Sequence, residues 1–290
     1  MRKYSLPILL LLGAAFTGIC GTTINSVNRY AYTANAGWID AYADGANGAV
    51  IGRYVCSNYL YGANIGWVHL GSGLPVNGIS YSNTAANDYG INVDAYGNMT
   101  GNAWGANIGW ITFEQSYGKP KVDMLNGALQ GHIWSGNIGW ISLSNAYAFV
   151  QTDTLANGPD TDGDGLPDPW EYTYTNVLTG LTSSPADADG DGSPDEVEFG
   201  AGTDPTDPTD LLEITAFVST NTTAPVITWT TKDTRFYELK QTDNLTNTTW
   251  SSSSIGMVTA PSTPSTTQTA TLAPTNTIFM KVEAILPLSP

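Results

Sequence analysis

The chain has 290 residues, enough for two or three domains, and combines 41% hydrophobic residues with only 12% charged ones. Its formal net charge of −16 at pH 7 argues against nucleic acid as a partner, and after the first twenty residues no apolar run is long enough to span a bilayer. The two cysteines, Cys20 and Cys56, are too few for a fold that depends on disulfides.

Residues 1–21 are expected to be a secretory signal peptide. Arg2 and Lys3 precede an apolar run that gives way near Thr17 to small residues, which is the layout of such a leader. A lipid on Cys20 is an alternative that Ile19 disfavours, because it spoils the lipobox. We therefore expect a protein that is secreted or retained at the cell surface after leader removal, with Cys56 as a buried free thiol.

Residues 22–150 are expected to form a domain of β-hairpin repeats. Four segments share the order aromatic, two residues, Asn, one residue, Gly, Trp and then Ile or Val, and they read YTANAGWI, YGANIGWV, WGANIGWI and WSGNIGWI. Asn and Gly between two β-prone runs predict a hairpin, because both tolerate positive φ. The spacings between their Trp residues are 29, 43 and 30, so the connections differ in length.

Alternation along each hairpin predicts an aromatic pair on its more polar face. Side chains of a regular strand point to opposite faces in turn, so the aliphatic residues after each Trp share the other face. Two interpretations of the rings remain open: a platform for an extracellular glycan, or a core in which neighbouring hairpins stack on the rings and bury them. The residues are Tyr32, Trp38, Tyr61, Trp67, Trp104, Trp110, Trp134 and Trp140.

Residues 151–210 are expected to bind two calcium ions. Fourteen of the 26 acidic residues lie between positions 159 and 210, which contain no Lys or Arg, while the other twelve nearly balance the ten basic residues. Two stretches have the EF-hand spacing of oxygen ligands at positions 1, 3, 5, 7, 9 and 12, with Gly at position 6. They have no His or Cys nearby, which favours calcium over zinc or copper. The ligands would be Asp160, Asp162, Asp164, the Leu166 carbonyl, Asp168 and Glu171, and then Asp187, Asp189, Asp191, Ser193, Asp195 and Glu198.

These two loops, DTDGDGLPDPWE and DADGDGSPDEVE, followed by GTDP at Gly202, resemble the thrombospondin type 3 repeats of extracellular proteins. The resemblance implies a segment filled with calcium and stabilised largely by the ions. It differs from long arrays in having two loops, joined by a stretch that is expected to form one short helix. More widely, GAVIGRYVC, GANIGW and the terminal TWTTKDTRFYELKQT are similar to a multidomain architecture of secreted bacterial surface proteins with aromatic GxNxGW-type β repeats, which implies the domain order and no catalytic activity.

Residues 211–290 are expected to form a fibronectin-like small antiparallel β-sandwich. Five strand-like runs, LLEITAFV, APVITWT, RFYELKQT, TTQTATL and TIFMKVEAI, are separated by turn-forming or polar stretches. The whole chain is therefore expected to be mainly β, with a hairpin-repeat domain, a short calcium-binding segment and a sandwich in that order.

The sequence favours a structural or adhesive protein in which calcium makes the junction between two β domains rigid. The alternative is a carbohydrate- or polymer-binding protein that uses the aromatic face of the repeats, and a surface protein is a further possible partner. We do not expect an enzyme, because His69 and His132 lie in different repeats and no Ser elbow, P-loop or zinc spacing is present. A calcium sensor is also disfavoured, because the flanks VQTDTLANGP and FGAGTDP lack the amphipathic helices that a sensor opens.

Overall fold

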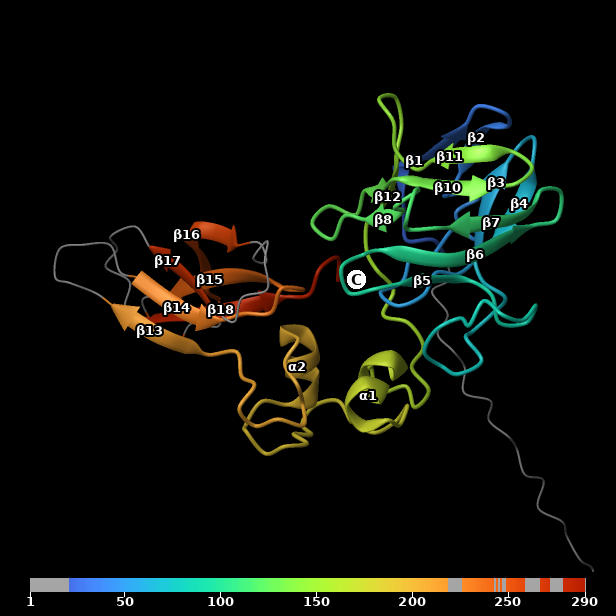
Figure 1. The fold of residues 1–290 in the computed structure, drawn as a ribbon. Coiled ribbons are helices and arrows are strands. Elements are labelled where there is room, and N and C mark those ends of the chain that lie inside the picture. The colour runs from blue at the N-terminus through green and yellow to red at the C-terminus, as the bar shows by residue number, and fades with distance from the viewer. Residues whose placement is uncertain are drawn as a thin grey trace, which may run out of the picture.

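The computed structural model describes residues 21–218, 226–242, 244, 246, 249–258, 267–271 and 279–289. The described chain is mainly β, as expected, and forms a barrel, a loop segment with two short helices and two small three-stranded sheets (Figure 1). Apart from Gly21, the expected signal peptide lies outside the described residues. Within the described part of the chain, neither helix has the length and apolar character needed to cross a membrane.

The four aromatic repeats close into a barrel. Each repeat contributes one antiparallel hairpin, and the hairpins pair edge to edge until β11 returns to β1. The barrel strands are β1 (Ile24–Thr33), β2 (Gly37–Asp40), β3 (Tyr59–Gly62), β4 (Gly66–His69), β6 (Met99–Gly105), β7 (Gly109–Phe113), β10 (His132–Ser135) and β11 (Gly139–Ser142).

Longer connections at the other end of the hairpins carry four additional strands. The strand β5 (Ile91–Val93) pairs with β6, and β12 (Val150–Thr152) pairs with the first half of β1. A separate ribbon is formed by β8 (Lys121–Val122) and β9 (Leu129–Gln130). Cys56 lies in this part of the core with no exposure, and burial raises the pKa of its thiol to about 12, as expected for an inert free cysteine.

The barrel interior is filled by one aliphatic cross-strand pair from each repeat. The first residue after each motif Trp points inward and faces an aliphatic residue of the partner strand, which confirms the predicted alternation. All eight side chains are buried: Ala31 with Ile39, Leu60 with Val68, Ala103 with Ile111, and Ile133 with Ile141. A small closed barrel of this kind is a packed core without a channel.

The hairpin turns explain the Asn and Gly of the repeat motif. Each motif Gly, at positions 37, 66, 109 and 139, has φ between 70° and 80°, a conformation that residues with a Cβ adopt only at a cost. Each motif Asn donates a hydrogen bond from Nδ2 to a backbone carbonyl in the turn of the preceding hairpin, with N···O distances of 2.9–3.2 Å. The first hairpin receives its bond in the same way from the second, and its own Asn35 reaches Ile138 of the fourth, so the four bonds form a closed ring.

The carbonyl acceptors of this ring belong to residues whose side chains plug the same end of the barrel. These residues occupy the variable position between Asn and Gly, and they are at most 9% exposed: Ala36, Ile65, Ile108 and Ile138. Room for them is made by small residues that follow the leading aromatic of each repeat. A Cβ on Gly62 or Gly105 would lie 2.7 Å from the Ile side chain of its own turn.

The C-terminal part forms a two-sheet sandwich. One sheet has the order β13 (Ile214–Val218), β14 (Val226–Thr230), β17 (Thr267–Thr271), and the other has the order β16 (Ser251–Val258), β15 (Phe236–Thr242), β18 (Phe279–Ile285). Their shared core is built on four fully buried side chains, Ile227, Trp229, Tyr237 and Leu239. The five expected strands are present, and β16 is an additional strand that the sequence did not predict.

Candidate metal centre

The first acidic loop gathers the carboxylates of ligand positions 1, 3 and 5. One carboxylate oxygen from each of Asp160, Asp162 and Asp164 lies within 4.8 Å of the others. The loop is shaped by its own backbone, since the Asp160 carboxylate accepts hydrogen bonds from the amides of Gly163 at 2.7 Å and Gly165 at 3.0 Å. The positive φ of Gly163 and Gly165, 75° and 101°, allows this tight turn.

The second loop repeats this geometry. One oxygen from each of Asp187, Asp189 and Asp191 again lies within 4.8 Å of the others, and the Asp187 carboxylate accepts from the amides of Gly190 and Gly192 at 2.7 and 2.9 Å. Burial, followed by the charge of Asp191, raises the pKa of Asp189. Two loops that are 27 residues apart therefore present the same oxygens in the same way, as their sequences predicted.

The position-12 glutamates supply the observation that distinguishes these loops from an ordinary acidic surface. Glu171 and Glu198 have no exposure, and in each the Oε2 atom is buried and without a hydrogen-bond partner among the described residues. The other oxygen is engaged: Glu171 Oε1 accepts from the Leu181 amide at 2.9 Å, and Glu198 Oε1 accepts from the Thr203 hydroxyl at 3.0 Å. Burial raises the pKa of both side chains to about 7, with smaller contributions from the loop aspartates.

The orphaned oxygens fit a bound cation. A buried carboxylate oxygen without a partner is costly, and a hard divalent ion beside it removes that cost. Asp189 Oδ2 and Asp191 Oδ2 are buried without a partner in the same way. The donor set is made of oxygens only, which is the set that calcium prefers over zinc or copper.

The aspartates of position 9 have a different role from the one the spacing predicts. Both Asp168 and Asp195 are 1% exposed, and their Oδ1 atoms accept from the amide at position 2 of their own loop, Thr161 at 2.6 Å and Ala188 at 2.9 Å. Asp168 Oδ2 additionally accepts from the Thr161 hydroxyl at 2.7 Å. These side chains close the loops, and they stand at the first residues of the helices α1 (Asp168–Thr175) and α2 (Asp195–Ala201).

Position 7 of each loop offers a backbone carbonyl, and the amide of the same residue is held by the aspartate two positions earlier. Leu166 has no exposure, and its amide donates to Asp164 Oδ1 at 2.8 Å. Ser193 donates its amide to Asp191 Oδ1 at 2.6 Å. The carbonyls of these two residues are therefore carried on loops whose conformation is set by several hydrogen bonds.

Three consecutive amides connect the two loops. Leu181 donates to Glu171 and Ser183 donates to Asp164 Oδ2 at 2.6 Å, both in the first loop, while Thr182 makes a longer contact of 3.4 Å with Asp195 Oδ2 of the second. The short helix expected with the first loop is present and begins at position 9 of that loop, and a second helix begins at position 9 of the second loop. The segment is thus one compact unit in which both loops share a connector.

A small hydrophobic core ties the loops to the domains on either side. It consists of Leu166, Trp170, Leu181 and Phe199, with Tyr54 of the barrel domain and Leu286 of the C-terminal tail packed against it. Trp170 and Phe199 are direct sequence neighbours of Glu171 and Glu198, and their rings meet with centroids 5.3 Å apart. Ligand position and core packing are therefore set by the same two helical turns.

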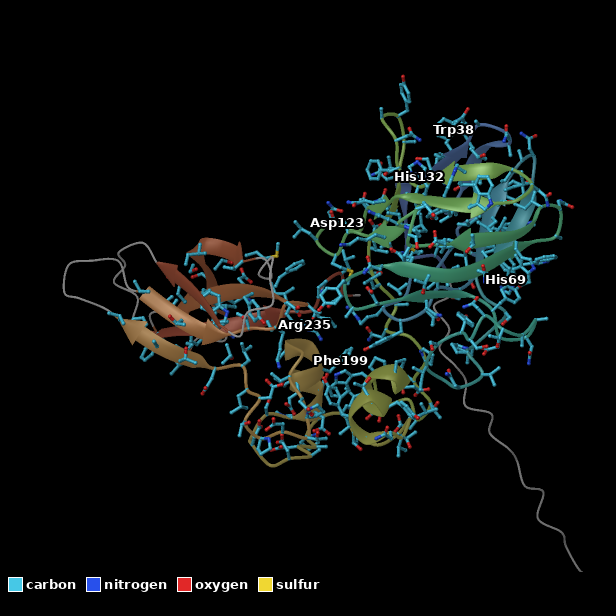
Figure 2. All side chains as sticks on the ribbon, in the orientation of Figure 1. Trp38, His69, Asp123, His132, Phe199 and Arg235 are labelled. Atoms are coloured by element: carbon cyan, nitrogen blue, oxygen red, sulfur yellow. The ribbon has the colours of Figure 1, made fainter. Side chains whose placement is uncertain are left out.

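Two buried arginines complete the junction. Arg235, from the turn before β15, donates to the carbonyls of Phe199 and Gly200 at 2.8 Å and so caps the end of α2 (Figure 2). Arg53 of the barrel domain donates to the Pro287 carbonyl at 3.0 Å, and burial lowers its pKa to about 10. After Pro287, Leu288 packs on the barrel core and accepts from the Leu155 amide, so the C-terminal tail returns to the barrel (Figure 1).

These contacts were not predicted from the sequence. Arg53, Arg235 and the residues of the C-terminal tail act through partners more than thirty positions away. The only local signal is that two arginines occur in β-rich stretches with few other charges.

The eight aromatic residues of the repeats lie on the outer wall of the barrel. In each hairpin the leading aromatic and the Trp face each other across the strands, with ring centroids 4.7–5.0 Å apart. All eight side chains are between 38% and 49% exposed. The interpretation in which neighbouring hairpins stack on these rings and bury them is wrong, because the hairpins join edge to edge and the aliphatic face alone turns inward.

Comparison of the chain with protein-family models, curated proteins and solved structures finds no match. The resemblance to thrombospondin type 3 repeats accordingly rests on the residues of the two loops and on the GTDP that follows them.

Proposed function

We propose that the protein is a calcium-binding structural protein of the cell exterior, in which two ions fix the junction between the barrel and the sandwich. The single observation that carries this proposal is the pair of buried Oε2 atoms of Glu171 and Glu198, which have no hydrogen-bond partner among the described residues and interact electrostatically with aspartates of their own loops. An acidic linker without a metal would turn such oxygens toward water. The loops correspond to thrombospondin type 3 repeats in this proposal.

The ions would be bound by the aspartates of positions 1, 3 and 5, the carbonyl of position 7 and the glutamate of position 12. A cation neutralises the mutual repulsion of these carboxylates, so its binding energy is coupled to the ordering of the segment. Loops of this kind in extracellular modules bind calcium with dissociation constants on the order of 10⁻⁴ to 10⁻³ M. The secretory leader expected at the N-terminus directs the chain to a compartment where such loops remain occupied.

The contacts of the loops with both domains support a role at the junction. Trp170 directly precedes Glu171, and Phe199 directly follows Glu198. The core that these two rings form contacts Tyr54 of the barrel domain and Leu286 of the C-terminal tail. Arg235 attaches the sandwich to the last turn of α2. Ordering of the glutamates by calcium therefore orders the surfaces that both domains contact, as in a structural or adhesive protein that needs a rigid connection.

The test is calorimetric titration of the full chain with calcium, followed by thermal melting and limited proteolysis with calcium or chelator. We expect two ions per chain, a higher melting temperature with calcium, and cleavage within residues 159–210 only in chelator. The double variant Glu171→Gln and Glu198→Gln should lose the calorimetric signal. Each single variant, Glu171→Gln or Glu198→Gln, should also weaken the signal, and Glu196→Gln, which removes one charge from an exposed position of α2, serves as the control matched to either of them.

The proposal fails if the melting temperature and the cleavage pattern are the same with calcium and with chelator. It also fails if Glu196→Gln weakens calcium binding as much as the double variant does, because the effect would then be one of general charge.

A further inference from the structure

One face of the barrel carries a continuous strip of seven rings. Starting from the leading aromatic of the second repeat, consecutive ring centroids are 4.9, 5.8, 4.6, 6.1, 5.0 and 4.7 Å apart. We call this set the aromatic strip, and in order of contact it consists of Tyr61, Trp67, Tyr59, His69, Tyr89, Trp110 and Trp104.

The strip joins two hairpins that are distant in sequence. Tyr89 belongs to the long connection between the second and third repeats, and its hydroxyl lies 3.2 Å from His69 Nδ1. Its ring makes an edge contact with Trp110 and thereby extends the ladder into the third repeat. The unequal Trp spacing of 43 residues thus has a structural counterpart, because the longer connection supplies the ring that fills the gap.

The strip is uncharged and half-exposed. Burial lowers the pKa of His69, so its imidazole is neutral at pH 7. Asp40, which lies across from Tyr61 in the barrel, is neutralised by Arg29 at 2.5 Å. Asn102 and Thr112 face each other on the same outer surface beside the Trp pair of the third repeat, where their amide and hydroxyl groups can hydrogen-bond a ligand.

This chemistry fits a neutral sugar polymer better than other ligands. Nucleic acids and acidic polymers require cations, which the strip lacks in a chain of net charge −16. A stable protein partner takes about 800 Å² from each side, which the convex wall of a narrow barrel presents poorly. Aromatic rings with exposed faces and polar neighbours offer apolar area and hydrogen bonds together, which is what the faces and hydroxyl groups of pyranose rings require.

We propose that the aromatic strip is a binding site for a neutral polysaccharide. The chain of sugars lies along the outer wall of the second and third repeats, packs on the exposed rings of Trp67 and Trp110, and hydrogen-bonds to Asn102 and Thr112. The proposal goes beyond calcium binding, since the strip belongs to the barrel wall and not to the acidic segment.

The strip has a matched control in the same barrel. Trp38 and Trp140 occupy the same motif position in the first and fourth repeats, and they are 49% and 46% exposed, compared with 43% and 48% for Trp67 and Trp110. Among the described residues, the ring contacts of Trp38 and Trp140 are confined to their own hairpins. Replacing either pair by Ala removes the same amount of outward-facing aromatic surface, and only one replacement interrupts the strip.

The experiment is affinity electrophoresis and co-sedimentation of the full chain, in calcium, with β-1,4-glucan, β-1,4-mannan, xylan and chitin, and with polygalacturonate as the anionic comparison. We expect binding to at least one neutral polymer and weaker binding to polygalacturonate. The Trp67→Ala, Trp110→Ala variant should lose at least about tenfold in affinity, the size of an aromatic hot spot, and the Trp38→Ala, Trp140→Ala variant should change less than about threefold. Repeating the assay in chelator separates this outcome from that of the calcium proposal.

A second measurement uses the unmodified chain, so that it does not depend on the folding of a variant. Oxidation of exposed tryptophans, followed by peptide mass spectrometry, should be slowed by the bound polymer at Trp67 and Trp110 and not at Trp38 and Trp140. Binding to none of the four neutral polymers, preference for polygalacturonate, or equal effects on the two Trp pairs in either assay would overturn the proposal.

Discussion

Replacement of Glu171 by Gln is expected to stabilise the calcium-free protein near pH 8 and to remove the stabilisation that calcium confers through the first loop. The folded protein places this carboxyl where it has no exposure, and burial raises its pKa from 4.5 to about 7. At 1.36 kcal/mol per pKa unit, this rise in the pKa lowers the free energy of unfolding at pH 8 by at most about 3 kcal/mol. Gln has the same shape and no charge, so it avoids this cost.

The sign of the pH dependence follows from the raised pKa. Between pH 4.5 and about 7 the folded state of the calcium-free protein retains a proton that the unfolded state has lost. The stability that Glu171 contributes is therefore fully present below pH 4.5 and is lost as the pH rises through about 7. If calcium binds as proposed, we expect it to reverse this dependence, because an ion bound to the carboxylate competes with the proton and its stabilising effect is lost as the pH falls.

The assay is urea denaturation of the full chain at several values between about pH 5 and 8, in chelator and in excess calcium, for the wild type, Glu171→Gln and Glu196→Gln. The wild type and the control should lose stability with rising pH in chelator, while Glu171→Gln should lose about half as much, because Glu198 still titrates. Parallel curves for all three proteins in chelator would refute the reasoning, since burial of the glutamate would then not set the pH dependence.

Three further predictions concern the scaffold. Cys56 should not react with a thiol reagent in the folded protein and should react fully in denaturant, because its thiol is buried and its pKa is raised to about 12; rapid labelling of the folded protein would contradict this. Gly66→Ala should lower the free energy of unfolding, measured by urea titration, by about 1–2 kcal/mol, because φ is 73° and the new Cβ would lie 3.0 Å from Asn107 Nδ2. Gly136→Ala is the control and should cost much less, because nothing lies within 4 Å of its Cβ position. Arg235→Ala should lower the free energy of unfolding by about 2–3 kcal/mol and increase proteolysis near α2. Arg235→Lys should not restore stability, because one ammonium group does not reproduce the two hydrogen bonds of the guanidinium to adjacent carbonyls. Full stability of Arg235→Lys would argue that charge alone matters.

The features that the sequence predicted are those encoded by neighbouring residues. Alternation placed Ile111 inside and Trp110 outside, and the ligand spacing placed Asp160, Asp162 and Asp164 together, because strand geometry and a glycine turn act over a few positions. The closure of the barrel was not predictable in this way. It depends on β11 meeting β1, more than a hundred residues earlier, and each hairpin alone is equally compatible with an open array.

The remaining differences have similar causes. The strand β16 begins with SSSS, which has neither alternation nor strong β propensity, and its pairing with β15 determines its conformation. Asp168 has the residue type and position of a ligand, yet its carboxylate closes the loop through Thr161, which only the folded backbone reveals. Arg235 caps α2 through a contact between a turn of the sandwich and that helix, and no local sequence pattern encodes this contact.

The ring of asparagine hydrogen bonds also fixes how this domain can change its size. In a linear solenoid, units can be added or removed one at a time, because each unit contacts only its neighbours. Here the four plugging side chains, Ala36, Ile65, Ile108 and Ile138, fill the mouth of a barrel whose circumference is set by eight strands. A barrel of five such hairpins would have a mouth wider than these side chains can cover. A barrel of only three hairpins would have no space for them. Copy number is therefore a geometric constant of this domain, and variation between its units is confined to the lengths of the connections and to the residues on the outer wall.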